Sequence, residues 1–245
     1  MSTTEVDVLP VKIEELNFAT PLADPRKNGG ERRRGVFITF EGIDGSGKTT
    51  QLKMLAKRLR TQGHDVIETA EPGGTEIGVQ IRSILLDSKN QALCSEAELL
   101  LMFAARAQNV EECILPALDA GRIVLSDRFT DSTVVYQGVG RGLGIEPVMT
   151  INRIACQGLT PDLTICMNID VNTGLARALT RDMDQGSTET RMEEQAIEFH
   201  QKVHAGYLEL AKREPERVRL VDGVGEPEEI AERVWDIVSR VVTSR

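Results

Sequence analysis

The chain has 245 residues, 40% hydrophobic and 27% charged, with a formal net charge of −9. These values are typical of an ordinary globular protein and exclude a disordered or fibrous one. The longest apolar run, Leu99 to Ala105, is less than half of the ~20 residues that span a bilayer. Because the N-terminus also lacks a signal-peptide pattern, we expect neither export nor a membrane anchor. The negative charge argues against a nucleic-acid partner, since phosphate backbones attract cationic surfaces.

The four cysteines are far apart in the sequence and form no CxxC pair; they are Cys94, Cys113, Cys156 and Cys166. This spacing predicts reduced thiols on core-facing helices and strands, as in a cytoplasmic protein. Residues 1–35 contain three prolines and end in a run of charges, without a sustained period. We therefore predict a mobile tail over 1–35 and a single domain over 36–245.

Within the predicted domain, β-rich apolar runs alternate with segments of helical periodicity. Strands are expected at 36–40, 65–69, 122–126, 163–169 and 218–221. Helices are expected from about 48, at 77–85 after a Thr75 cap, at 95–119, from about 172, at 191–212 and at 227–242. A polar stretch at 181–190 interrupts the last part of this pattern. Such alternation predicts an α/β fold with a five-stranded parallel sheet between two layers of helices. Ligands of such sheets bind beyond the carboxyl ends of the strands.

A phosphate-binding motif follows the first predicted strand. The segment from Gly42 to Thr49 fits GxxxxGK[ST] at every fixed position and opens a helix, the context that a P-loop NTPase fold requires. Glycines let successive backbone N–H groups point at one anion, and the helix N-terminus adds partial positive charge. The predicted nucleotide-binding residues are Gly42, Ile43, Asp44, Gly45, Ser46, Gly47, Lys48, Thr49 and Thr50.

A magnesium site is expected beside this loop. The Thr49 hydroxyl can ligate Mg²⁺, and Asp127, at the end of a strand, can hold the ion directly or through water. Asp127 has two other interpretations, a cap of the strand end or an ion pair with the adjacent Arg128.

The sequence places arginines near the same mouth. Arg128 follows Asp127, Arg82 lies on the second predicted helix, and Arg106 shares a helix face with Met102 and Phe103. A guanidinium beside an apolar side chain suits a nucleotide monophosphate, because the cation can hold the phosphate while the flat group faces the base. A GTPase is disfavoured, because no Asn-Lys-x-Asp segment is present.

These motifs together resemble the bacterial thymidylate kinase family. The resemblance rests on the phosphate loop, Glu71-Pro72-Gly73-Gly74-Thr75, Arg82, residues 102–108, Asp127-Arg128-Phe129 and residues 132–138, and it extends from about Val36 to the C-terminus. It implies transfer of the γ-phosphoryl group of ATP to dTMP, in a homodimeric enzyme. One position departs from the family, because Met102 stands where a base-stacking aromatic residue is usual and Phe103 is next to it.

The resemblance also implies residue roles. Lys48 and the loop hold ATP, and Asp44 faces the deoxyribose 3′-hydroxyl. The other implied dTMP contacts are Arg82, Phe103, Arg106, Arg128, Ser132, Thr133, Tyr136 beside the sugar 2′ position, Gln137 and Glu193. Since the loop contains no arginine, a lid at about 181–190 is expected to supply a catalytic one, with Arg181 the first choice and Arg191 the second. Two alternatives remain, another nucleotide kinase of the same fold and a P-loop ATP switch.

Overall fold

The computed structural model describes residues 34–243. Nearly all of the predicted tail, 1–33, therefore lies outside the described residues. Its last two residues pack as part of the domain instead. The Arg34 guanidinium donates to Asp162 at 2.9 Å, and the Gly35 amide donates to the Leu118 carbonyl oxygen at 2.8 Å.

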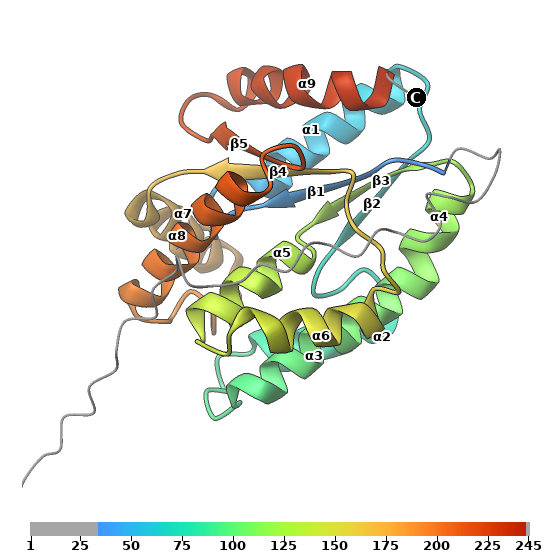
Figure 1. Ribbon diagram of the computed structural model, residues 1–245. Coiled ribbons are helices and arrows are strands. Elements are labelled where there is room, and N and C mark those ends of the chain that lie inside the picture. The colour runs from blue at the N-terminus through green and yellow to red at the C-terminus, as the bar shows by residue number, and fades with distance from the viewer. Residues whose placement is uncertain (1–33, 244–245) are drawn as a thin grey trace, which may run out of the picture.

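Five parallel strands form one sheet in the order β2-β3-β1-β4-β5 (Figure 1). The strands are β1 (Phe37–Glu41), β2 (Val66–Ala70), β3 (Ile123–Asp127), β4 (Leu163–Asn168) and β5 (Val218–Asp222). β1 lies at the centre, where Phe40 is paired with Asp127 on one side and with Ile165 on the other. The strand order reverses at β1, because β3 and β2 lie on one side of it and β4 and β5 on the other. The carboxyl end of β1 is therefore the expected ligand site.

Helices cover both faces of the sheet and complete the predicted three layers (Figure 1). They are α1 (Lys48–Thr61), α2 (Glu76–Leu86), α3 (Ser95–Asn109), α4 (Leu115–Asp119), α5 (Thr130–Thr133), α6 (Ile145–Ala155), α7 (Val171–Gln185), α8 (Ile197–Arg213) and α9 (Pro227–Thr243). Two π-helical segments, η3 (Val110–Ile114) and η4 (Val134–Gly140), extend α3 and α5. The core alternates along β1, because Ile38 and Phe40 pack with α1 and α9 whereas Phe37 packs with α3 and α6.

Several helices differ from the sequence-based expectation. Neither α5 with its extension η4 nor α6 was expected, although Ile145, Val148 and Ala155 are buried on one face of α6. α7 continues through the first half of the expected polar stretch and ends at Gly186, which has the left-handed φ of 59° that favours glycine. α8 begins at Ile197 rather than near 191. Exposed helices carry many polar residues, which is why the second half of α7 has the composition of a loop.

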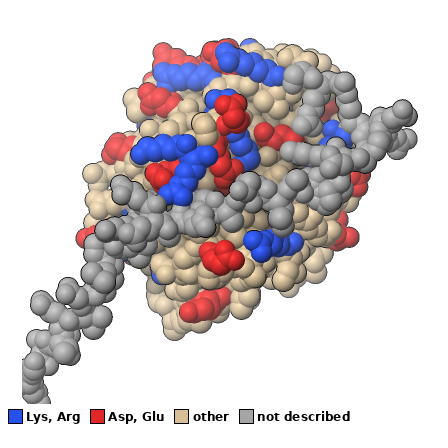
Figure 2. Space-filling view, viewed as in Figure 1, with Lys and Arg blue, Asp and Glu red and all other residues tan. Residues whose placement is uncertain are grey.

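The cysteine prediction holds in part. All four cysteines are free, with Cys156 and Cys166 buried, Cys113 half-buried and Cys94 exposed at the start of α3. The prediction that all four thiols face the core is therefore wrong for Cys94. Among residues 34–243, no helix has the length and the apolar character to cross a bilayer. The face seen in Figure 2 carries basic and acidic side chains interspersed rather than a continuous basic patch.

Candidate active site

A cavity of about 250 Å³ opens at the carboxyl ends of β1, β2 and β3. Most of the predicted site residues line it, namely Asp44, Lys48, Thr49, Arg82, Arg106, Asp127, Arg128, Ser132, Thr133, Tyr136, Gln137, Arg181 and Glu193. They come from loops and helices that are distant in sequence, and the parallel sheet brings them to one edge.

The phosphate loop connects β1 to α1 and forms one end of the cavity. A Cβ atom on Gly45 would lie 2.0 Å from the Gly174 carbonyl oxygen, so only glycine lets the loop pass α7. The ammonium of Lys48 donates to the carbonyl oxygens of Gly42 at 3.0 Å and of Ile43 at 2.7 Å. Because an ammonium has three N–H groups, one remains for a ligand. Burial, together with the Arg128 charge, lowers the pKa of Lys48 to about 8.

Thr49 and Asp127 meet at the cavity wall, where the threonine hydroxyl donates to a carboxylate oxygen of Asp127. Two oxygen ligands in this position are the chemistry that Mg²⁺ prefers. The alternative ion pair between Asp127 and its neighbour is not formed, because Arg128 pairs with Asp44 instead.

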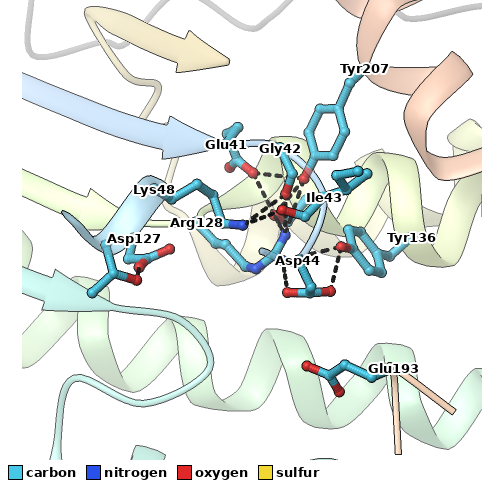
Figure 3. Close-up of polar contacts among 12 residues, drawn as sticks. Glu41, Gly42, Ile43, Asp44, Lys48, Asp127, Arg128, Tyr136, Glu193 and Tyr207 are labelled. Atoms are coloured by element: carbon cyan, nitrogen blue, oxygen red, sulfur yellow. Dashed lines mark hydrogen bonds and ion pairs between the residues drawn. The ribbon is translucent and has the colours of Figure 1, made fainter. Parts of the chain in front are cut away.

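Arg128 is the centre of a dense network beneath the phosphate loop (Figure 3). Its guanidinium pairs with Asp44 and donates to Ser132 Oγ at 3.0 Å and to the Tyr136 hydroxyl at 3.1 Å. Tyr136 in turn donates to Asp44 at 2.9 Å. Burial alone would raise the pKa of Asp44, but the nearby charges of Arg128 and Lys48 hold it below its usual range. Asp44 is therefore an ionised acceptor at the cavity wall.

The comparisons with known proteins agree with this geometry. Residues 40–234 match the family model described as thymidylate kinase. The chain belongs to the thymidylate kinase family. It is 52% identical over 212 residues to a thymidylate kinase of Pelobacter propionicus, which covers 86% of this chain and 95% of that protein. It is 45% identical over 209 residues to the enzyme of Solidesulfovibrio magneticus, which covers 84% and 100%.

A solved structure supports the same assignment. The crystal structure of thymidylate kinase from Ehrlichia chaffeensis superposes with a TM-score of 0.66 at 33% identity, over 84% of this chain and 99% of that one. The predicted family, the predicted P-loop fold and the predicted class of enzyme, a phosphotransferase, are thereby confirmed.

At the base site, where this chain departs from the family pattern, the structure distinguishes Met102 from Phe103. Met102 lines the cavity, whereas Phe103 is 2% exposed and packs in the core. The Phe103 ring lies under Arg106, whose guanidinium carbon is 4.9 Å from the ring centroid. The prediction that Phe103 contacts substrate is therefore wrong in this structure, because the helix turns that side chain toward the sheet. The thioether of Met102 is the apolar group at the cavity wall.

Arg106 is buried and held from several sides. It pairs with Glu71, and its Nη2 atom donates to the Phe129 carbonyl oxygen at 3.0 Å and to Thr133 Oγ1 at 2.9 Å. Its Nη1 atom is buried and has no hydrogen-bond partner among residues 34–243. A buried N–H without a partner costs free energy, so this atom marks a place for a ligand acceptor.

The segment predicted as a lid brings Arg181 to the cavity, and Glu193, which follows that segment, lines the cavity as well. Arg181, with a side chain 46% exposed, pairs with Asp182 at 2.8 Å and with Glu193 at 3.5 Å. Burial and the neighbouring Asp44 charge raise the pKa of Glu193 to about 7. Arg82 donates to Glu189, which belongs to the predicted lid segment, at 2.8 Å. Each of these charged groups has a partner that a ligand would have to displace or share.

Arg191 does not reach the cavity, which corrects the second choice of catalytic arginine. It is 2% exposed, donates to the Leu85 carbonyl oxygen and pairs with Glu98 at 2.7 Å. Its guanidinium is thus held by two groups that do not line the cavity, and loss of this side chain would leave the Glu98 carboxylate less well compensated.

Sequence reasoning missed Glu41, a fully buried residue at the end of β1. Its carboxylate accepts hydrogen bonds from the Tyr207 hydroxyl at 3.0 Å (Figure 3), from Ser132 and from the Phe129 amide at 2.8 Å. Burial, with the Asp131 charge, raises the pKa of Glu41 to about 7. A carboxylate that ends an otherwise apolar strand was the available signal.

The short helix α5 faces two ways. Thr130 donates to Asn152 at 2.8 Å, and Asp131 holds Arg217 at 2.7 Å, both away from the cavity. The next two residues, Ser132 and Thr133, contact the site network instead. The cavity wall is thus anchored to the core by the residues that directly precede it.

Proposed function

We propose that this chain transfers the γ-phosphoryl group of ATP to dTMP within the cavity described above. The single observation that carries the proposal is the unpartnered, buried Nη1 atom of Arg106, a residue that lines the same cavity as Lys48. A cation with a free donor suits a monophosphate, and a lysine on a phosphate loop suits a triphosphate. A site that holds both can align an acceptor phosphate with a donor phosphate.

On the donor side, the loop from Gly42 to Thr50 wraps the ATP phosphates. Its backbone N–H groups and the N-terminus of α1 bind the anion. Gly47 contributes only its backbone, because it has no side chain. The lysine N–H that is free of the Gly42 and Ile43 carbonyl oxygens is directed to the outer phosphates.

Thr49 and Asp127 would hold Mg²⁺, since their oxygen atoms already converge at the cavity. When bound, the ion neutralises charge on the β- and γ-phosphates. The remaining electrostatic work falls on side chains of the chain itself.

On the acceptor side, Arg82, Arg106 and Arg128 bind the dTMP phosphate. Asp44 accepts from the sugar 3′-hydroxyl, and the Tyr136 ring occupies the space beside C2′. The base lies against Met102, and its edge meets the polar groups of Ser132, Thr133 and Gln137. Glu193, across the cavity from these residues, closes the sugar end.

In the transfer step, a dTMP phosphate oxygen attacks the γ-phosphorus. The bond from that phosphorus to the β-bridging oxygen breaks, and ADP departs with the electron pair. Lys48 and Arg181 stabilise the charge that develops on the phosphoryl oxygens. Arg181 suits this task because its side chain is half exposed and can leave its carboxylate partners.

Three further properties stay predictions. They are the homodimer implied by the family, the cytoplasmic location suggested by the reduced cysteines, and the absence of a nucleic-acid partner.

An acceptor screen tests the proposal. The full chain with Mg-ATP would be assayed for ADP formation with dTMP, dUMP, dCMP, AMP and GMP. We expect the highest kcat/KM for dTMP. A preference for a purine nucleotide would favour another nucleotide kinase, and slow hydrolysis that no acceptor stimulates would favour an ATP switch.

A further inference from the structure

Glu98 is a buried carboxylate outside the cavity wall that no predicted role includes. It lies on α3, is 0% exposed, and accepts hydrogen bonds from three side chains. Gln137 donates at 2.8 Å, Arg141 donates at 3.1 and 2.9 Å, and Arg191 donates at 2.7 Å. Two arginines therefore compensate one carboxylate, and the remaining contact is to a residue of the base site.

The contact from Gln137 fixes which end of its amide faces the cavity. An ionised carboxylate can only accept hydrogen bonds, so the Gln137 NH₂ group must point at Glu98. Burial alone would raise the pKa of Glu98, but the hydrogen bonds from Arg141 and Gln137 hold it below its usual range, so the carboxylate is ionised. Among residues 34–243, no hydrogen bond to the Gln137 amide oxygen is formed, although this side chain lines the cavity. The oxygen is the end left for a ligand.

An amide oxygen held in this direction distinguishes bases that present a hydrogen-bond donor from bases that present an acceptor. Thymine carries a donor at N3–H, which an amide oxygen can accept. Cytosine carries an acceptor at N3, which would face the same oxygen without a hydrogen between them. A freely rotating glutamine could turn its NH₂ group to cytosine and would not discriminate.

We propose that Glu98 is a positioning residue for base specificity, which locks Gln137 with its amide oxygen toward the base and so selects a pyrimidine with a donor at N3. This inference rests on the proposed function, because it requires the base to lie against Gln137. Arg141 and Arg191 keep the buried carboxylate charged, and a charged carboxylate is what prevents the amide from turning over.

The contacts of Glu98 also extend to the segment that follows the lid. Arg191 lies in that segment, and Arg141 donates to Gln195 at 2.6 Å. Both arginines bind Glu98, so the orientation of the base-reading amide is set by the same carboxylate that anchors residues 191–195.

The test compares Glu98→Gln and Glu98→Asp with the unmodified chain. The glutamine variant keeps the size but can donate, so Gln137 can turn over. The aspartate variant keeps the charge for both arginines, which favours folding, but is one methylene too short for the 2.8 Å contact to Gln137. In both, we expect the ratio of kcat/KM for dTMP to that for dCMP to fall by about tenfold or more. The ratio for dTMP to dUMP should stay within twofold, because both bases carry the N3 donor.

Two further variants separate the possible failures. Glu96→Gln, on the same helix and exposed, should leave both ratios unchanged. Gln137→Leu should lower the dTMP to dCMP ratio as the Glu98 variants do, and adding Glu98→Gln to it should cause no further change. A purely structural role would lower kcat/KM for dTMP, dUMP and dCMP alike, with every ratio kept, and would overturn the inference.

An unchanged ratio in Gln137→Leu would overturn the base-reading role of Gln137 itself, and the inference with it. An unchanged ratio in folded Glu98 variants alone would overturn only the inference. Folding would be checked by circular dichroism and thermal unfolding of each full-length variant.

Discussion

The donor and acceptor ends of the cavity are built in different ways. At the donor end, the Lys48 ammonium is held by two backbone carbonyl oxygens, and its neighbours in the loop are consecutive in sequence. At the acceptor end, the three arginines proposed to bind dTMP are each held by a carboxylate from a distant segment: Arg82 by Glu189, Arg106 by Glu71 and Arg128 by Asp44.

This difference separates two ways of preparing a cation for a phosphate. Backbone carbonyl oxygens hold a lysine without neutralising its charge, so the donor end keeps its attraction for a triphosphate. Carboxylates fix the geometry of the arginines while removing part of their net charge. The acceptor end therefore gains precise geometry at the expense of affinity for phosphate, and its stability depends on ion pairs that are buried.

The largest expected effect falls on the donor end. Lys48→Ala should lower kcat by on the order of 10³-fold, because the lysine stabilises charge in the transition state and no other ammonium replaces it. The fold should persist, since only two hydrogen bonds to carbonyl oxygens are lost. Steady-state kinetics and circular dichroism would measure both. The matched control is Lys53→Ala, on the exposed face of the same helix. Near-normal turnover of a folded Lys48→Ala protein would contradict the donor site.

The next effect falls on the acceptor end and concerns stability. Glu71→Gln leaves the Arg106 charge buried without its carboxylate, and we expect a loss of about 3 kcal/mol in the free energy of unfolding. Urea denaturation would measure it. Glu68→Gln, on the strand that directly precedes Glu71, breaks an ion pair in which the Glu68 side chain is 31% and the Arg60 side chain 48% exposed. That control should cost at most about 1 kcal/mol. Equal losses in the two variants would show that burial of the Arg106–Glu71 pair does not increase its effect on the free energy of unfolding.

A third pair of variants distinguishes the role of Arg181 from that of Arg191. Arg181→Ala should lower kcat by about 10²-fold with little change in the KM for ATP, since the arginine acts in the transition state. Arg191→Ala should instead lower stability and keep most of kcat, because this side chain binds Glu98 rather than the cavity. Arg177→Ala, exposed on α7, is the control. If Arg181→Ala retains more than about half of the wild-type kcat, the lid arginine is not the missing cation.

The smallest effect tests the sugar site. Tyr136→Ala should lower the preference for dTMP over the ribonucleotide by about tenfold, because the ring leaves no room for a 2′-hydroxyl. Tyr136→Phe keeps the ring and should keep the preference, while it loses the 2.9 Å hydrogen bond to Asp44. The ratio of kcat/KM for the two nucleotides would be measured in each. A preference that survives in the alanine variant would make Tyr136 a purely structural residue.

The same contrast explains what the sequence could predict. The sheet and the phosphate loop follow from local patterns, because a buried strand, a glycine-rich turn and a helix are consecutive. The positions of Arg82, Arg106 and Arg128 at one mouth followed from their places after strands. The pairing of Arg82 with Glu189 and of Arg106 with Glu71 did not, nor did the buried positions of Glu41 and Glu98, because these carboxylates contact residues tens of positions away and leave no local period. Phe103 and Arg191 were misplaced for a related reason. The position of a residue around a helix or turn decides whether its side chain meets the core or the cavity. Spacing along the sequence alone does not fix that position.

The two-faced helix α5 bears on how the gene for such an enzyme can change. Thr130 and Asp131 are fastened to the core, and the two residues after them form the cavity wall. A point substitution at one of these positions alters the contacts of one side chain. Inserting or deleting one codon between Asp127 and Gln137 would exchange the residues that face the core with those that face the substrate. The length of this stretch should therefore stay constant among descendants of one ancestor.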